Sequence, residues 1–395
     1  MTDTSKPLPL AGIRVVEFTH MVMGPAVGAI LVELGAEVIK VEPIGGDATR
    51  ELLGSGAGYF PMYNRNKKSL CLDLKHPRGL EIARRLASSA DVVVENFRTG
   101  AMQKLGLGYE DLAPLNPRLI YCSEKGFLSG PYEHRTALDE VVQMMGGLAY
   151  MTGPPGRPLR AGTSVVDVTG GMFGAIGILA ALEERHRTGK GQKVASSLFE
   201  TVVYLVGQHM AQMAVTGKAA QPMPVRISAW AIYDVFETKD GEQVFVGVVS
   251  DGLWEKFCKA FDLAELGADP KYKTNSQRVL AREKLLPEVR ELFRGFSKAE
   301  LVARLEKTGL PFAPIGKPEE MFDDPHLAAS GGLGPVTLAN GKETKLPILP
   351  LEMDARRPTQ GGQLARIGEH TNEVLATLGL EPGDIAALRA ANAVA

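Results

Sequence analysis

The chain has 395 residues, of which 45% are hydrophobic and 23% charged, and its formal net charge is −2. This length exceeds what one hydrophobic core usually supports, so two domains are expected. The near-neutral charge argues against nucleic-acid binding, and three widely spaced cysteines without an apolar leader or an apolar run of about 18 residues predict a reduced, cytoplasmic protein outside the membrane.

The first half of the chain alternates strand and helix signals. The composition of buried strands recurs at residues 13–18, 37–42, 69–74, 90–95 and 119–123. Gly24-Pro25 starts a helix over 26–34 that Gly35 ends, and His76-Pro77 starts another that runs to about Ser89. Strands that alternate with helices predict an α/β fold, with a large domain built on a Rossmann-like parallel sheet.

The second half of the chain changes in character. Two long helices are expected over 169–187 and 198–214, with a turn and a strand (193–197) between them. A β-hairpin (230–236 and 243–249) and charged helices (253–261, 283–293 and 297–308) follow. We therefore expect a large domain over 1–220, a smaller α+β domain over 225–315, and a segment over 320–395 that returns to the large domain.

The strongest candidate for chemistry is Asp167, between an apolar run and the Gly170-Gly171 pair that opens a long apolar helix. An ionisable side chain after an apolar run is costly to desolvate unless its charge is used or paired. The glycines let a ligand approach the backbone, and a helix start offers N–H groups to a developing oxyanion. This segment alone also fits a capping aspartate, which is the commoner role at a helix start.

The opening strand–helix–strand segment invites a comparison with dinucleotide-binding proteins, because Glu42 closes the second strand where an acid could hold a ribose. The connecting turn (19–26) lacks the G-x-G-x-x-G pattern, so NAD or FAD is not expected. The turn still follows a strand, at the edge where parallel sheets bind ligands. The histidines and cysteines show neither metal-ligand nor serine-hydrolase spacing, so no metal is expected.

Two further features have both an ordinary and a functional interpretation. The cationic cluster Arg65, Lys67 and Lys68, beside Tyr63, is most simply a solvated surface, but it would be functional if it bound phosphates. Asp139, at the start of an apolar helical run, is either an ordinary first-turn carboxylate or a second acid near Asp167.

A series of segments carries a more specific signal. They are residues 16–20 with Gly24-Pro25, then 34–42, 66–69, 72–75, 94–102, 116–120, 162–167 and 187–192. In this order they resemble the family III CoA-transferases, the group that contains formyl-CoA and carnitine CoA-transferases. The similarity is dense over roughly the first 215 residues and thinner beyond them.

The resemblance implies roles for particular residues. Asp167 matches the family's catalytic aspartate, and Asp139 matches an acidic position near it. The positions that match CoA-binding residues are His20, Met21, Val22 and Met23 at the thiol end, Asn96, Phe97, Arg98 and Met102 around CoA, and the phosphate-side cations Lys68, Lys75 and Lys104. Two departures are Pro43, where some members have an arginine, and Ser250–Gly252, where some have a glycine-rich loop.

The expected function is a CoA-transferase that moves CoA from an acyl-CoA donor such as succinyl-CoA to a small carboxylic acid. Aspartyl anhydride and aspartyl-CoA thioester would be the intermediates, with Asp167 ionised at a pKa of about 4 and N–H groups near Gly170 and Gly171 stabilising oxyanions. Acyl-CoA is then a substrate, no cofactor is bound permanently, and the resemblance implies an interlocked homodimer.

Two alternatives remain. A 2-methylacyl-CoA racemase shares the family fold, but its members have a histidine immediately before the acid that matches Asp139, where this chain has Leu138. A non-catalytic CoA-binding protein would not need the intact segment around Asp167.

Overall fold

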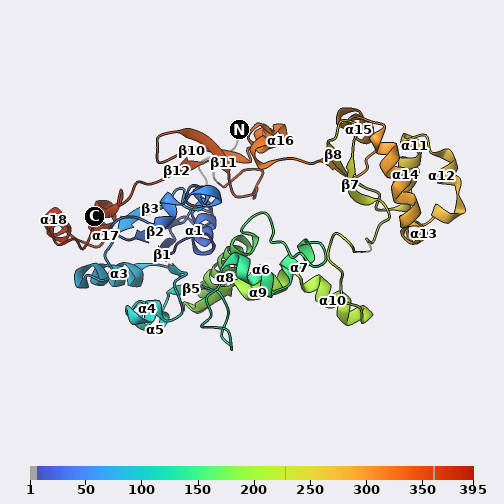
Figure 1. The fold of residues 1–395 in the computed structure, drawn as a ribbon. Coiled ribbons are helices and arrows are strands. Elements are labelled where there is room, and N and C mark those ends of the chain that lie inside the picture. Colours follow the sequence, from blue (N-terminus) through green and yellow to red (C-terminus); the bar gives the residue numbers. More distant parts are fainter. Residues whose placement is uncertain (1–6, 227, 359–360) are drawn as a thin grey trace. The chain divides into compact units, whose positions relative to one another are not determined.

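The chain folds into two compact units in the computed structural model, which describes residues 7–226, 228–358 and 361–395 (Figure 1). The first unit comprises Met1–Pro224 and Phe322–Ala395, and the second comprises Val225–Met321. Each unit has its own sheet and its own hydrophobic core. The fold is therefore of the mixed α/β class.

A six-stranded parallel sheet forms the centre of the first unit. Its strands are β1 (Arg14–Phe18), β2 (Glu37–Glu42), β3 (Lys68–Cys71), β4 (Val92–Glu95), β5 (Ile120–Lys125) and β6 (Lys193–Ser197). The order is β3-β2-β1-β4-β5-β6 with parallel neighbours, which confirms the predicted Rossmann-like sheet. The winding direction reverses between β1 and β4, and such sheets bind ligands outside the carboxyl ends of the strands at this switch point.

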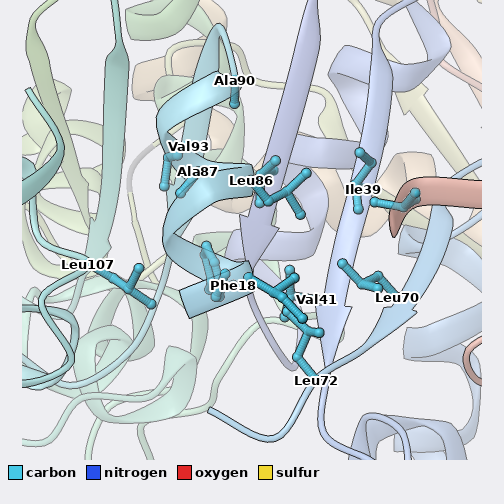
Figure 2. Close-up of a cluster of buried hydrophobic side chains, with 14 of the residues drawn as sticks. Phe18, Ile39, Val41, Leu70, Leu72, Leu86, Ala87, Ala90, Val93 and Leu107 are labelled. Atoms are coloured by element: carbon cyan, nitrogen blue, oxygen red, sulfur yellow. The ribbon is translucent and has the colours of Figure 1, made fainter. Parts of the chain in front are cut away.

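Helices cover both faces of the parallel sheet. Helices α1 (Met23–Glu33) and α8 (Val165–Thr188) contribute to the core on one face, and α3 (Pro77–Ser89), α17 (Thr371–Thr377) and α18 (Pro382–Ala390) contribute to the core on the other. Figure 2 shows the second of these cores, in which Leu86 and Ala87 of α3 lie near Phe18 of β1 and Ile39 and Val41 of β2. The C-terminal residues thus complete a core that the N-terminal strands begin.

Helix α8 has 24 residues and is apolar enough to cross a membrane by length and composition alone. In this fold it contacts α1, β5 and β6, and 44% of its most apolar stretch is buried. A Cβ atom at Gly171 would lie 2.7 Å from the carbonyl oxygen of Met23, so only a glycine lets the two helices approach this closely. The first turn of α1 is therefore held against the second turn of α8.

Shorter elements complete the first unit. The helices are α2 (Tyr59–Tyr63), α4 (Ala101–Lys104), α5 (Tyr109–Leu112), α6 (Asp139–Met145), α7 (Leu148–Thr152), α9 (Leu198–Leu205), α10 (Gly207–Thr216) and α16 (Pro325–Ser330), and a small sheet has the order β11 (Glu343–Pro347), β10 (Leu333–Thr337), β12 (Gly362–Gln363). The single helix expected over 198–214 is in fact two, because the chain leaves helical geometry at Val206, just before a glycine.

The second unit is an antiparallel sheet with helices. Its strands, in the order β7 (Tyr233–Glu237), β8 (Gln243–Gly247), β9 (Phe312–Pro314), pack with α11 (Asp251–Ala260), α12 (Ala264–Ala268), α13 (Asn275–Leu280), α14 (Arg282–Arg294) and α15 (Lys298–Leu305). The predicted hairpin is present. At Ser250–Gly252, where some family members have a glycine-rich loop, this chain starts a helix: Ser250 caps α11 by accepting a hydrogen bond from the Leu253 N–H.

Candidate active site

Asp167 lies in the first turn of α8, on the helix that packs against the start of α1. Its side chain is half-buried. Burial, followed by the negative charge of Asp139, raises the pKa of the Asp167 carboxyl to about 7. The carboxylate was expected to be fully ionised at neutral pH; instead its ionised and protonated forms are both substantial there.

Asp139 caps α8 from a different helix. This carboxylate is 3% exposed and begins α6. Its Oδ2 accepts hydrogen bonds from the N–H groups of Val166 (2.8 Å) and Asp167 (3.1 Å), while its Oδ1 accepts one from the Gln143 amide. Gln143 in turn accepts a hydrogen bond from the Ala161 N–H at 2.8 Å. Asp139 therefore orients the helix start that carries Asp167, and its charge acts on the same carboxyl.

The backbone N–H groups at the start of α8 already have partners. The Val165 N–H donates to the Thr163 carbonyl at 2.8 Å, the next two donate to Asp139, and the Val168 N–H donates to the Ser164 carbonyl at 3.0 Å. Gly170 and Gly171 lie in the second turn, where N–H groups bond to carbonyls one turn earlier. Regular helix geometry therefore does not support the expectation that their N–H groups receive an oxyanion.

Hydroxyl groups stand beside Asp167. The Ser164 hydroxyl donates to the Tyr59 hydroxyl at 3.4 Å, one turn before the carboxylate. Tyr63, at the end of the same short helix α2, has its pKa raised by burial and by the neighbouring charges of Asp167 and Tyr59. Sequence reasoning missed Ser164 and Tyr59 as members of the site, because only the fold brings α2 to the start of α8.

The turn after β1 is joined to the turn after β4 across the switch point. The His20 N–H donates to the Asn96 side-chain oxygen at 3.0 Å, and the Asn96 amide donates to the His20 carbonyl at 2.8 Å. The His20 and Phe97 rings lie 5.9 Å apart between centroids. Partial desolvation lowers the pKa of the His20 imidazole below its usual range and so favours the neutral ring.

The residues expected at the thiol end of CoA divide into two pairs. His20 and Met21 are exposed, and Met21 has a positive φ of 62° that non-glycine residues seldom adopt. Val22 and Met23 are buried, at 1% and 5% exposure. Only the first pair therefore presents side chains to a ligand, while the second pair anchors the turn.

The other residues expected around CoA also divide. Lys75, Arg98 and Lys104 are exposed and Asn96 is half-buried. Met102 is only 1% exposed and belongs to the core with α3, so its expected contact with CoA is not supported. Lys68 is held by Glu37 (2.5 Å) and Glu373 (2.7 Å) beside the start of β2, so it is not free for a phosphate as expected.

The cationic cluster before β3 is neither a solvated surface nor a phosphate site. Arg65 pairs with Glu33 at 3.2 Å and Lys67 with Glu17 at 2.8 Å, and all four side chains are buried. The partners of these cations are carboxylates distant in the sequence, so the spacing of residues could not reveal the ion pairs. The signal that was available is the presence of Glu17 and Lys40 within strands that otherwise read as apolar.

Comparisons with known proteins agree with this geometry. The family described as CoA-transferase family III matches residues 10–371. A succinyl-CoA:glutarate CoA-transferase of Mus musculus is 33% identical over 381 residues, covering 95% of this chain and 87% of that protein. A succinate–glutarate CoA-transferase of Agrobacterium fabrum is 34% identical, covering 96% and 98%. The crystal structure of a CAIB/BAIF family protein from Brucella suis has a TM-score of 0.82 at 34% identity, covering 94% of this chain and 100% of that one.

Proposed function

The chain belongs to CoA-transferase family III, and we propose that it transfers CoA from an acyl-CoA donor, such as succinyl-CoA, to a small carboxylic acid. The observation that carries this proposal is Asp167, a half-buried carboxylate at the start of α8, which packs on α1, the helix that follows strand β1 of the switch point. A CoA-transferase needs such a group, because a carboxylate can accept both an acyl group and a thiol in turn.

The proposed reaction begins with attack of the Asp167 carboxylate on the thioester carbonyl of the donor. The C–S bond breaks, leaving a mixed anhydride on Asp167 and a CoA thiolate. The thiolate attacks the aspartyl carbonyl and expels the donor acid as a carboxylate, which leaves an aspartyl-CoA thioester. The acceptor carboxylate then attacks this thioester, and the released thiolate takes the new acyl group from the second anhydride, restoring Asp167.

The surroundings of Asp167 suit this chemistry in two ways. Its raised pKa makes the ionised carboxylate a better nucleophile than an ordinary aspartate, at the cost of a smaller ionised fraction at neutral pH. Because the first-turn N–H groups of α8 are occupied and the Ser164 hydroxyl donates to Tyr59, we assign stabilisation of the tetrahedral oxyanions to the hydroxyl groups of Tyr59 and Tyr63. Burial also protects the anhydride from water.

A small dicarboxylate is the proposed acceptor class. The names of the two relatives described above both contain glutarate, together with succinyl-CoA in one and succinate in the other, and both relatives match almost the whole of this chain. Lys75, Arg98 and Lys104 are exposed cations, and we assign them to CoA phosphates. The racemase alternative lacks support, since Leu138, which is 55% exposed, offers no base at the position before Asp139.

The functional form is proposed to be a homodimer. None of the residues of α10, all of which the structure describes, is buried, although Met210, Met213 and Val215 are apolar. An apolar groove of about 350 Å³ also lies between α1, α8 and residues 347–351. Extended apolar surface on a soluble chain marks an association site, and a second copy of this chain is the partner we propose.

The test of the transfer mechanism is direct. Incubation with succinyl-CoA, followed by borohydride or hydroxylamine and peptide mass spectrometry, is expected to place an adduct on Asp167. Asp167→Ala is expected to lower transfer by a factor of about a thousand or more, as loss of a covalent nucleophile does. Glu110→Ala, which removes an exposed carboxylate of α5, is the matched control. Normal transfer by Asp167→Ala would refute the mechanism.

A further inference from the structure

A buried network of charged side chains lies under the turn that follows β1. Glu17, Lys40, Asp47 and Lys67 are each at most 6% exposed. The Lys40 ammonium lies 2.9 Å from an Asp47 oxygen and 3.8 Å from Glu17, and the Lys67 ammonium lies 2.8 Å from Glu17. Burying so many charges is costly unless every one is paired and hydrogen-bonded, so the remaining bonds of the two lysines are informative.

Each lysine also donates a hydrogen bond to a backbone carbonyl at one end of the turn. Lys40 donates to the carbonyl of Thr19 at 2.7 Å, immediately before His20. Lys67 donates to the carbonyl of Pro25 at 2.9 Å, in the first turn of α1. Helix α1 makes room for this network at Gly28, where a Cβ atom would overlap the Glu17 carboxylate. The network thus clamps both ends of residues 19–25.

Side chains hold the middle of the turn as well. Asn96 bonds to both backbone groups of His20, and the Thr49 hydroxyl accepts a hydrogen bond from the Met21 N–H at 3.1 Å. Asp47, the partner of Lys40, accepts a hydrogen bond from the Thr49 N–H at 2.8 Å and so links this contact to the network. The unusual backbone of Met21 persists because its neighbours fix it, and such strained residues gather at functional sites.

We propose that Lys40 is a positioning residue of the transfer reaction, which fixes the Thr19 carbonyl so that the side chains of His20 and Met21 meet the thiol end of CoA. This inference rests on the proposed function. A buried lysine whose role was only to neutralise the carboxylates within the sheet would pair with those carboxylates and would need no bond to the turn. Lys40 instead places a donor on the last backbone carbonyl before the two exposed residues of the turn.

The test compares the two ends of the CoA molecule. In Lys40→Met, kcat/KM for an acyl-pantetheine donor is expected to fall at least about tenfold, the equivalent of one hydrogen bond to a charged group. Inhibition by adenosine 3′,5′-bisphosphate, which represents the nucleotide end, is expected to change by less than about twofold. Arg14→Met, which removes a cation from the opposite end of β1, is the control and should leave both values unchanged.

Other outcomes are equally decisive. The proposal would be overturned if kcat/KM for the acyl-pantetheine donor and inhibition by adenosine 3′,5′-bisphosphate changed by similar factors in Lys40→Met, or if neither changed. If Lys40→Met does not fold, Lys40→Arg keeps the buried charge but not the position of the donor, and the same selective loss is expected in weaker form. Amide exchange of the peptide over 19–25 reads the turn without activity. The proposal requires faster amide exchange over 19–25 in the variant than in the wild type. If the wild type transfers CoA to none of the acids tested, that result refutes the proposed function, while the exchange measurement still tests the role of Lys40 in holding the turn.

Discussion

The ionisation of one carboxyl group sets the pH at which the proposed reaction can run. The Asp167 pKa of about 7 arises from burial and from Asp139, and only the ionised form is a nucleophile. We expect kcat/KM to rise from about pH 5, with a midpoint near 7, and to level off by about pH 9. Initial rates with a fixed donor across this range check the prediction. A profile that is flat between pH 5.5 and 8, to within about a factor of two, would contradict it.

A neutral residue at position 139 is expected to move this midpoint. Asp139→Asn removes the negative charge, so the midpoint should shift to lower pH while burial keeps it above that of a free aspartate. The variant should also lose stability by about 1–3 kcal/mol, because its amide would face the Gln143 amide and leave a buried donor unpaired. A pH–rate profile and urea unfolding measure the two effects separately, and an unshifted midpoint would remove Asp139 from the electrostatics of the site.

Glu124 is a second carboxyl group with a large shift, and it affects stability. Burial raises its pKa to about 8, and among the described residues only the Cys122 thiol bonds to it, through Oε1. The folded state holds this proton while the unfolded state releases it near pH 4.3. Its contribution to stability is therefore complete below that pH and is lost as pH rises to about 8.

Replacing Glu124 with glutamine should remove that loss. Glu124→Gln is expected to be more stable than the wild type at pH 8, on the order of a few kcal/mol, and to show a shallower fall in unfolding free energy between about pH 5 and 8. Urea titrations at several pH values check this. Glu110→Gln, on the exposed side of α5, is the control. Identical pH slopes for Glu124→Gln and the wild type would show that the buried carboxyl ionises normally.

Single residues also show where sequence reasoning reached its limit. Asp167 could be singled out, because a carboxylate beside two glycines at a helix start is visible in the sequence. The cap from Asp139, the partners of Lys68 and the burial of Met102 could not, since each depends on a residue or a core far away in the chain. Charged residues inside apolar strands, such as Lys40, were the signal that went unused.

At the scale of elements, the glycine side of α8 determines how close the two halves of the site lie. In Gly171→Ala the new methyl group would meet the Met23 carbonyl oxygen at 2.7 Å, so α1 or the turn before it must move. We expect the free energy of unfolding to fall by about 1–3 kcal/mol. We also expect kcat to fall, because the displaced turn no longer holds the two halves of the site in their reactive arrangement. Gly383→Ala in α18, where the methyl group meets open space, should be neutral or slightly stabilising.

Strands and long helices were predictable because each has a strong local pattern. Most of the parallel strands are short apolar runs, and α3 begins at a His-Pro pair that fixes its start. The division between α9 and α10 was not predictable, because the apolar pattern continues through Val206 and only the following glycine hints at a break. The short helices α6 and α7 are set by their neighbours more than by their own propensity.

At the scale of the whole molecule, the unburied apolar side of α10 leads to a prediction about assembly. We expect the wild type to run at about twice the 42.4 kDa of one chain, and Met210→Lys with Met213→Lys to shift the protein towards monomer, because buried lysines would oppose association. Light scattering after gel filtration measures the masses. Leu115→Lys, an isolated exposed leucine, is the control. A monomeric wild type at about 10 μM would refute the homodimer.

The late return of the chain to its first sheet bears on how the protein is made. Val374, Leu375 and Ile385 pack on the face built by β1 to β4, and Val394 pairs with Leu72. While a ribosome is still adding these residues, one hydrophobic face of the nascent sheet is uncovered. Contacts between residues this distant in sequence also form slowly. The newly synthesised polypeptide should therefore depend on chaperones until translation has passed residue 394, and a premature stop before Thr371 should yield inclusion bodies.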